Sequence, residues 1–369
     1  MFTLLLIAQA FSLTGGYIQT LVLSWIAADT AGGLYALSFY MIACYLPVAL
    51  LAYPFGRWLD RRPQKKWLLL SESLLAALSL LLWQGAKRGW LSFPFLLTFG
   101  AIWGVVRAFQ TPLYQSLPKK LSENLSKGTA LLTAVTCTAR GIGPILGGLL
   151  YQRYGAPVPF FMNFLSFLPS LLLLSLIKIP PNRAGEKPAL KKHLPLLCKI
   201  FLVGFLGINY NVTFVALVRE RGFESGAYGI ALGLLGLGAL AGLFLKSRVK
   251  KPLPLGIFPL LMGVLNLCLS KAAGLLWIGA CILLYGILDF WFFAQSIFLL
   301  TKEIKKEETT ALMGLYTMVS VGAMPAGALF WSFIARTFSL PSALALIGAG
   351  LLLLGSFLFI PKRDVKKSQ

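Results

Sequence analysis

The segment Gly56–Lys66, with the sequence Gly-Arg-Trp-Leu-Asp-Arg-Arg-Pro-Gln-Lys-Lys, is a short and strongly charged break between two long apolar runs. One apolar run ends near Phe55 and the next begins at Trp67. A membrane-spanning helix needs roughly 20 apolar residues, and both runs reach that length. The segment therefore predicts two spanning helices that are joined by a charged loop.

The composition places the rest of the chain in a lipid bilayer as well. Of the 369 residues, 57% are hydrophobic and 12% are charged, whereas a soluble domain carries about 25% charged residues. The net charge of +22 would suggest nucleic acid in a soluble protein, but the basic residues here occupy short breaks between apolar runs. We therefore expect no nucleic-acid partner. The single histidine, His193, and the absence of a Cys-x-x-Cys pair lead us to expect no metal ion and no cofactor.

Division of the chain at its charged or Pro/Gly breaks predicts an all-α membrane protein with twelve spanning helices. The predicted spans are 3–27, 33–55, 67–86, 92–115, 127–150, 157–178, 198–218, 226–246, 253–270, 273–299, 309–335 and 339–360. A basic, proline-rich segment separates two sets of six spans. We predict an N-terminal bundle over 1–179, a cytoplasmic linker over 180–197, and a C-terminal bundle with a short tail over 198–369.

The distribution of basic residues predicts the orientation of the chain in the cell membrane. With the N-terminus inside, 25 of the 34 Lys and Arg residues lie in cytoplasmic segments and seven lie on the other side. Arg107 and Arg140 remain inside predicted spans. This asymmetry favours a multi-pass protein with both termini in the cytoplasm, and we expect it to be a monomer.

The fourth predicted span contains a polar stripe around a charged residue. Trp103, Arg107, Gln110 and Tyr114 lie at offsets of 0, 4, 7 and 11, which places them on one face of a helix. A charge near the bilayer centre costs about 2.5–3.5 kcal/mol, so this face is expected to border a cavity. Arg107 then binds an anionic group or affects the protonation of a nearby carboxylate. The structural alternative is a permanent partner of a buried acid or of carbonyl groups.

Asp289 in the tenth predicted span is the candidate proton carrier. Tyr285 lies one helical turn before it on the same face. A carboxylate that is removed from water holds a proton more readily and can release it when access alternates between the two sides. The alternative is that Asp289 is a static partner of Arg140 or Arg107.

Four further polar residues lie within the predicted spans. Arg140 is a candidate for the same cavity, although a structural role beside Pro144 is also expected. Gln19 and Asn211 are candidates for hydrogen bonds to a substrate, or for helix-packing contacts. Glu72 lies near Lys65 and Lys66 in the sequence, and we interpret it as an ion-pair partner at the cytoplasmic end of its helix more than as a central carrier.

Three local motifs resemble those of the major facilitator superfamily. The first is the loop between spans two and three, which matches at Gly56, Asp60, Arg61 and Lys65; its glycine allows close approach of another helix. The second is the Arg-x-x-Gln core in span four, formed by Arg107 and Gln110. The third is a Pro/Gly motif in span five, which matches at Gly143, Pro144, Gly147 and Gly148. Span eleven repeats a Pro/Gly break at Pro325 and Gly327, and paired breaks of this kind point toward the transport pathway.

The resemblance implies two six-helix bundles, a loop that acts as a gating latch, and, through the third motif, an antiporter that exports its substrate. Our hypothesis is a secondary active transporter that couples protons to the export of a small amphipathic molecule, such as a drug-like compound or a siderophore, by alternating access. The alternatives on the same fold are an importer, a lipid flippase or a sensor. An enzyme is not expected, because the spans carry no paired acids, no Gly-x-Ser-x-Gly elbow and no histidine-based metal spacing.

Overall fold

The computed structural model describes the whole chain apart from a few short segments. The described residues are 1–30, 32–59, 62–180, 190–207, 209–249, 253–272, 274–301 and 309–359. All regular structure within them is helical, so the all-α prediction is confirmed. The helices are α1 Phe2–Asp29, α2 Leu34–Leu59, α3 Gln64–Arg88, α4 Phe93–Leu121, α5 Leu125–Tyr154, α6 Pro157–Leu176, α7 Leu190–Gly207, α8 Tyr210–Glu220, α9 Ser225–Arg248, α10 Ile257–Ser270, α11 Leu275–Thr301, α12 Thr309–Thr337 and α13 Leu340–Phe359.

A side-chain cap starts one of the helices, and glycines with positive φ end two of them. Asn124 caps α5 by accepting a hydrogen bond from the backbone N–H of Lys127 at 3.0 Å. Gly89 follows α3 with a φ of 72°, and Gly155 follows α5 with the same value. Such positive φ angles favour glycine, because it has no Cβ to clash with the backbone.

The twelve predicted spans correspond to helices of the structure. In the described part of the chain, eleven segments are long and apolar enough to cross a membrane, and the shorter helix Ile257–Ser270 occupies the ninth predicted span. The seventh span consists of two helices, α7 and α8, rather than one. Helix α7 also begins at Leu190, before the predicted start at residue 198, so part of the predicted linker is helical.

The break between α7 and α8 leaves backbone carbonyl groups that other helices satisfy. Trp331 Nε1 donates to the Phe205 carbonyl at 3.0 Å, and the Tyr285 hydroxyl donates to the Gly207 carbonyl at 2.9 Å. A backbone group without a partner is costly in a bilayer, so these two bonds stabilise the broken helix.

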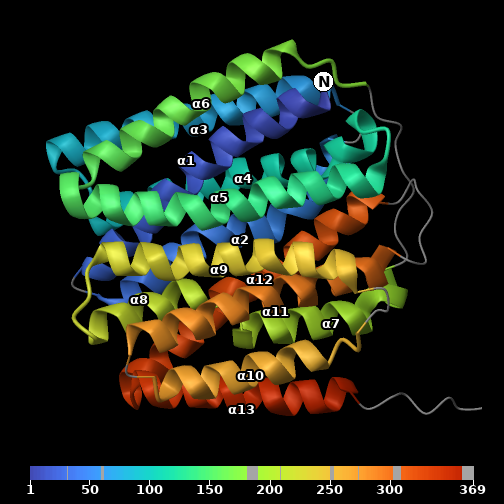
Figure 1. Ribbon diagram of the computed structural model, residues 1–369. Coiled ribbons are helices and arrows are strands. Elements are labelled where there is room, and N and C mark those ends of the chain that lie inside the picture. The colour runs from blue at the N-terminus through green and yellow to red at the C-terminus, as the bar shows by residue number, and fades with distance from the viewer. Residues whose placement is uncertain are drawn as a thin grey trace, which may run out of the picture.

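The helices form two groups that follow the chain order. Helices α1 to α6 occupy one side of Figure 1 and α7 to α13 the other, with α2 and α5 of the first group beside α9 and α12 of the second. Helix α1 begins, and α13 ends, at the same face of the molecule, which we call the terminal face. The other end of the helices is the opposite face.

Glycines allow the two groups to approach closely where α5 crosses α9. A Cβ on Gly148 of α5 would lie 2.5 Å from the Ser225 carbonyl oxygen, and a Cβ on Gly229 of α9 would lie 2.5 Å from the Pro144 carbonyl oxygen. Gly147 does the same toward α1, since its Cβ would lie 2.8 Å from the Ile18 carbonyl oxygen. The Pro/Gly motif of α5 therefore packs this helix against one neighbour from each half of the molecule.

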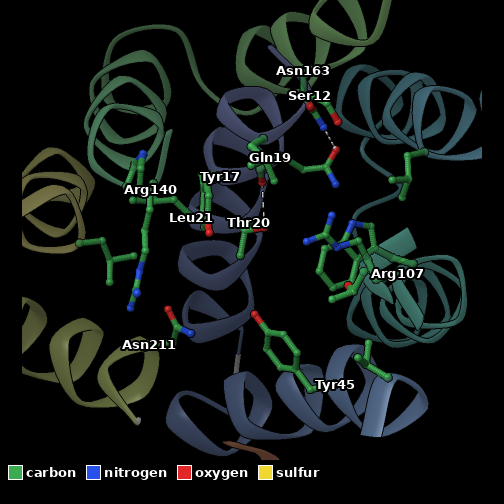
Figure 2. Close-up of a pocket in the computed structure, with 18 of the residues that line it drawn as sticks. Ser12, Tyr17, Gln19, Thr20, Leu21, Tyr45, Arg107, Arg140, Asn163 and Asn211 are labelled. Atoms are coloured by element: carbon green, nitrogen blue, oxygen red, sulfur yellow. Dashed lines mark hydrogen bonds between the residues drawn. The ribbon is translucent and has the colours of Figure 1, made fainter. Parts of the chain in front are cut away.

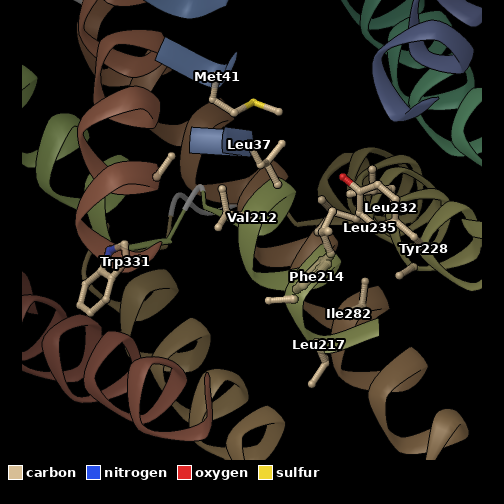
Figure 3. Packing of buried hydrophobic residues seen from close by; sticks show 14 of the residues in the cluster. Leu37, Met41, Val212, Phe214, Leu217, Tyr228, Leu232, Leu235, Ile282 and Trp331 are labelled. Atoms are coloured by element: carbon tan, nitrogen blue, oxygen red, sulfur yellow. The ribbon is translucent and has the colours of Figure 1, made fainter. Parts of the chain in front are cut away.

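The main apolar core crosses between the two halves. Leu37 and Met41 of α2 belong to the same buried cluster as Val212 of α8, Leu235 of α9 and Trp331 of α12 (Figure 3). A second cluster, which includes Leu5, lies near the terminal face and is built within the first half alone. The halves thus share their core toward the opposite face.

Candidate functional site

A cavity of about 290 Å³ lies between the two halves of the molecule. Most of its wall comes from α1 to α6, and α8, α9 and α12 complete it. Both charged and aromatic side chains contribute, and Figure 2 shows Arg107 and Arg140 on opposite sides of α1. The lining residues with polar or aromatic side chains are Ser12, Tyr17, Gln19, Thr20, Tyr45, Ser79, Trp103, Arg107, Thr111, Arg140, Asn163, Phe167, Tyr210 and Asn211.

Arg107 reaches the cavity from α4, as the polar stripe predicts. Its Nη1 donates to Gln110 Oε1 at 2.5 Å, and its guanidinium lies 5.5 Å from the centre of the Trp103 ring. Tyr45 meets the same ring edge-on, at 6.2 Å between ring centres. Arg107 forms no ion pair with any carboxylate that the structure describes. Its positive charge is therefore available to a ligand in the cavity.

Glu72 lies behind this wall and differs from our interpretation of it. It is fully buried, and it accepts hydrogen bonds from Ser12 of α1 and from Gln110 and Tyr114 of α4. Lys65, one of its expected partners, donates instead to the Ser175 carbonyl of α6. Glu72 is thus the centre of a polar cluster inside the first half and not an end-of-helix ion pair. The helical spacing of α3 places Leu75 and Ser79 on the same face as Glu72, and both line the cavity. That spacing could have indicated that Glu72 points into the first half.

Arg140 and Asp289 form an ion pair between the two halves. Arg140 Nη1 of α5 lies 3.4 Å from Asp289 Oδ2 of α11. The guanidinium also lies over the Tyr210 ring, 5.0 Å from its centre. Arg140 lines the cavity, whereas Asp289 is 2% exposed and lies behind it. Of the two partners that the sequence left open for Asp289, the structure brings Arg140 into contact.

The two atoms that face away from this contact lack hydrogen-bond partners. Arg140 Nη2 and Asp289 Oδ1 are both buried and unpaired within the described part of the protein. The hydrogen bonding of the ion pair is therefore incomplete, and buried polar atoms without partners are costly. An anion near Arg140 would give its Nη2 an acceptor, and a proton on Asp289 would remove the buried negative charge.

An uncharged network forms the wall nearest α6. Asn163 Nδ2 donates to Gln19 Oε1 at 2.7 Å, and the Ser79 hydroxyl donates to the same oxygen at 2.9 Å. Asn211 lines the other half of the cavity. Tyr285 does not reach it, because its hydroxyl is engaged with the carbonyl at the end of α7. Sequence reasoning identified Gln19 and Asn211 but missed Ser79 and Asn163, whose small polar side chains resemble ordinary packing residues.

The paired Pro/Gly breaks lie at comparable places around the cavity. Pro144 of α5 lines it, and so does Met324, which precedes Pro325 of α12. Gly143 approaches α1, since its Cβ would lie 2.6 Å from Tyr17 Cβ. Neither proline interrupts its helix, because α5 runs over Leu125–Tyr154 and α12 over Thr309–Thr337. The two Pro/Gly motifs thus border one cavity from the two halves as parts of continuous helices.

The predicted gating loop is only partly described. Asp60 and Arg61 lie outside the described residues, so the latch stays a prediction. Gly56 is buried at the end of α2, and a Cβ there would lie 3.7 Å from Pro112 Cβ. That is an ordinary contact, so the approach of α2 and α4 does not itself require glycine.

Polar contacts join the two halves at the opposite face. Arg219 of α8 donates to the carbonyls of Trp25 and Ala28 of α1 at 3.0 and 2.7 Å, and it pairs with Asp29 at 3.2 Å. The Ser38 hydroxyl of α2 lies 2.6 Å from that of Ser332 of α12. These contacts hold the halves together at that face. As for cofactors, the described residues contain no group of three His, Cys, Asp or Glu side chains that could hold a metal ion.

Comparison with known proteins gives a consistent result. The sequence profile of the Major Facilitator Superfamily matches residues 5–328. The Staphyloferrin A transporter of Staphylococcus aureus (strain NCTC 8325 / PS 47) is 20% identical over 385 residues, covering 95% of this chain and 94% of that protein.

Solved structures with similar folds include transporters from bacteria and humans. The human organic anion transporter MFSD10 (TETRAN) has a TM-score of 0.76 at 17% identity, covering 97% of this chain and 98% of the other. A bacterial homologue of the iron transporter ferroportin, in an outward-facing state, has a TM-score of 0.70 at 18% identity with the same coverage. At identities this low, the structural similarity shows a shared fold alone.

Proposed function

Because this chain belongs to the Major Facilitator Superfamily, we propose that it is a secondary active transporter that moves a small amphipathic organic anion across the membrane by alternating access, with coupling to protons. The observation that carries the choice of an anion is Arg107, a cavity-lining guanidinium without a carboxylate partner among the described residues. The aromatic rings of Trp103 and Tyr45 beside it suit an amphipathic molecule.

Two similar proteins have names that bear on the substrate, and one of these names specifies an organic anion. One is a transporter of the siderophore staphyloferrin A, and the other is an organic anion transporter. Their sequences differ from this chain at most positions, so the cavity residues carry the proposal and the names support it. The bacterial ferroportin homologue provides a third relative in fold that is linked to iron transport.

Alternating access is supported by the cavity between the two halves and by the contacts that close it toward the opposite face. The shared core and the Arg219 and Ser38 contacts lie toward the opposite face. If the termini are cytoplasmic, as the basic residues predict, that face is extracellular and this structure represents a state closed to the outside. Opening would then separate Arg219 from α1 and Ser38 from Ser332.

Proton coupling is supported by the contact between Arg140 and Asp289. An anion that draws Arg140 away leaves Asp289 buried without its cation, and a proton on Asp289 removes that cost. The contact thus favours joint binding of the anion and the proton. The Pro/Gly motif of α5 suggests antiport through family resemblance. Antiport requires the anion and the proton to bind in turn, so the direction of proton movement relative to the anion distinguishes antiport from joint transport.

The proposal is tested by transport in proteoliposomes with a panel of organic anions that includes staphyloferrin A. We expect saturable flux of at least one anion and its loss in Arg107→Ala. The matched control is Arg153→Ala, because Arg153 is an exposed arginine at the end of α5 that packs on Tyr154. Flux that Arg107→Ala leaves unchanged, or flux of cations alone, contradicts the proposal.

The same vesicles report coupling and direction when the lumenal pH is recorded. Protons that move with the anion support joint binding, and protons that move against it support antiport. Inward flux under a physiological gradient would make the protein an importer. Movement of labelled phospholipid between leaflets would favour a flippase, and binding without any flux would favour a sensor.

A further inference from the structure

Glu72 is a buried carboxylate that the proposed transport cycle has not yet used. We propose that Glu72 is a second proton-binding site, and that its protonation controls the affinity of Arg107 for an anion. The inference rests on the proposed function, since the anion is the transported substrate. Glu72 lies on α3 within the first half, so it is separate from the pair between Arg140 and Asp289.

The environment of Glu72 is polar but offers no direct counter-ion. Its side chain is fully buried, and the three groups that donate to it, Ser12, Gln110 and Tyr114, are neutral. The charged group that acts on it is Arg107, through Gln110. From α6, Ser170 lies beside Tyr114. Burial without a cation in contact makes the charged form of Glu72 costly, while the three donors stabilise that form, so the site can hold either state.

Gln110 transmits the state of Glu72 to Arg107. Its Oε1 accepts from Arg107 at 2.5 Å, and its Nε2 donates to Glu72 Oε1 at 3.1 Å. A guanidinium has donors and no acceptor, so the amide oxygen must face Arg107 and the amide nitrogen must face Glu72. The amide is therefore fixed in one orientation, and the two charges are linked by two aligned hydrogen bonds.

The same bonds determine which oxygen of Glu72 takes the proton. Oε1 accepts from Gln110 and from the Tyr114 hydroxyl at 2.5 Å, and Ser12 lies 3.1 Å away. Among the described residues, Oε2 accepts a hydrogen bond from Ser12 alone, at 3.0 Å. A hydrogen on Oε1 would face two donors, so the proton belongs on Oε2, from which it can be donated to Ser12 Oγ.

Ser12 connects this oxygen to the cavity. Its side chain lines the cavity on one side and contacts Glu72 on the other. A hydronium ion in the cavity gives a proton to Ser12 Oγ while the hydroxyl hydrogen of Ser12 passes to Glu72 Oε2. One O–H bond forms on Glu72, Ser12 is unchanged at the end, and a water molecule remains in the cavity.

The consequence for Arg107 follows from the charge balance. An ionised Glu72 partly neutralises Arg107 through Gln110 and weakens its attraction for a second anion. A protonated Glu72 leaves the positive charge of Arg107 to the ligand. Proton and anion therefore bind with positive cooperativity, and each raises the affinity of the other by the same factor.

Infrared spectroscopy of the full-length protein in lipid nanodiscs tests the site without a ligand. We expect a carboxylic-acid band that titrates with pH, disappears in Glu72→Gln and remains in Asp289→Asn. The matched control is Ser71→Ala, because Ser71 is the buried neighbour of Glu72 on α3 and its hydroxyl donates to the Leu68 carbonyl of its own helix. An unchanged band in Glu72→Gln, or a band that does not titrate, overturns the proposal.

The link to Arg107 is measured in the same spectra. Removal of its positive charge in Arg107→Ala should move the midpoint of the Glu72 band to higher pH by about one unit, or tenfold in proton affinity. In Gln110→Leu the amide link is lost, and the midpoint should depend less on Arg107. A midpoint that is the same in wild type and Arg107→Ala overturns the coupling.

Binding of citrate, a simple tricarboxylate, separates this inference from the proposed function. At alkaline pH we expect Glu72→Gln, which mimics the protonated state, to bind citrate about five- to tenfold more tightly than wild type, and the difference should vanish in acid. Equal affinity at alkaline pH contradicts the coupling. If citrate and the other anions of the panel fail to bind wild type, the proposed function fails, while the infrared result still decides whether Glu72 binds a proton.

Discussion

Two regions beside the cavity combine an arginine with a buried carboxylate, and they differ in how the two are joined. Arg107 and Glu72 both belong to the first half and are linked through the amide of Gln110. Arg140 and Asp289 come from different halves and touch directly at 3.4 Å. Rocking of the halves leaves the first arrangement intact but must change the second. The first is therefore suited to tune ligand binding, and the second to report relative movement of the halves.

The two regions also differ in how well their polar atoms are satisfied. Glu72 receives hydrogen bonds from three side chains. In the other pair, Asp289 Oδ1 and Arg140 Nη2 are buried without partners among the described residues. A saturated cluster holds one geometry, whereas the half-satisfied pair keeps two buried polar atoms that a ligand or water could still bond.

The largest predicted effect is a difference in the free energy of unfolding between Arg140→Ala and Arg107→Ala. Arg140→Ala leaves Asp289 buried without its cation and should destabilise the protein by about 3 kcal/mol, the lower end for a buried pair because the Arg140 side chain is 21% exposed. Arg107→Ala should cost less than about 1 kcal/mol, because no described carboxylate depends on it directly. Thermal unfolding of the two purified variants in one detergent measures the difference.

A double variant provides the control for that contrast. Arg140→Leu combined with Asp289→Leu removes both charges and should recover most of the stability without recovering proton-coupled transport. Equal melting temperatures for Arg140→Ala and Arg107→Ala would show that the direct pair is no more important to the fold than the indirect one.

A smaller effect is expected from a substitution that displaces the α5 backbone at Arg140 and keeps both side chains of the ion pair. In Gly236→Ala the new Cβ would lie 2.4 Å from the carbonyl carbon of Arg140, so α5 must move away from α9. We expect a loss of about 2 kcal/mol, as for overpacked sites, and weaker contact between Arg140 and Asp289. Gly274→Ala is the control, because a Cβ there meets nothing within 4 Å. A melting temperature unchanged by Gly236→Ala argues against tight packing at this crossing.

The smallest effect is expected within the saturated cluster. Tyr114→Phe removes the hydroxyl that donates to Glu72 at 2.5 Å. Since Ser12 and Gln110 still donate, the cost should be about 1 kcal/mol, together with easier protonation of Glu72 in the infrared titration. Tyr316→Phe serves as a matched control, because Tyr316 is a buried tyrosine of the other half. A loss as large as that of Arg140→Ala would mean that the cluster is held by this one bond.

Most of the fold was predictable from the sequence, because membrane spans are encoded locally. Apolar runs bounded by charges, prolines and glycines give each span, and all twelve predicted spans correspond to helices. The break between Gly207 and Tyr210 was not predicted, although Gly207, Asn209 and Asn211 interrupt the apolar run there. It is stabilised by Trp331 and Tyr285, which are distant in the sequence.

The candidate site was predictable where a charge stands alone in an apolar run. Arg107, Arg140 and Asp289 were identified for that reason, and two of them line the cavity. Glu72 was misjudged because its nearest charges in the sequence are Lys65 and Lys66. In the structure its neighbours are Ser12, Gln110 and Tyr114, which come from two other helices.

The sequence by itself determined that this chain is helical and crosses a membrane, because hydropathy and helical spacing depend only on residues close together in the chain. It also determined which side chains are too costly to face lipid. Only the tertiary structure decided that Asp289 pairs with Arg140 and that Gln110 hydrogen-bonds both Glu72 and Arg107. Those contacts depend on how helices from different parts of the chain pack, and helix packing sets distances that spacing along a single helix cannot give.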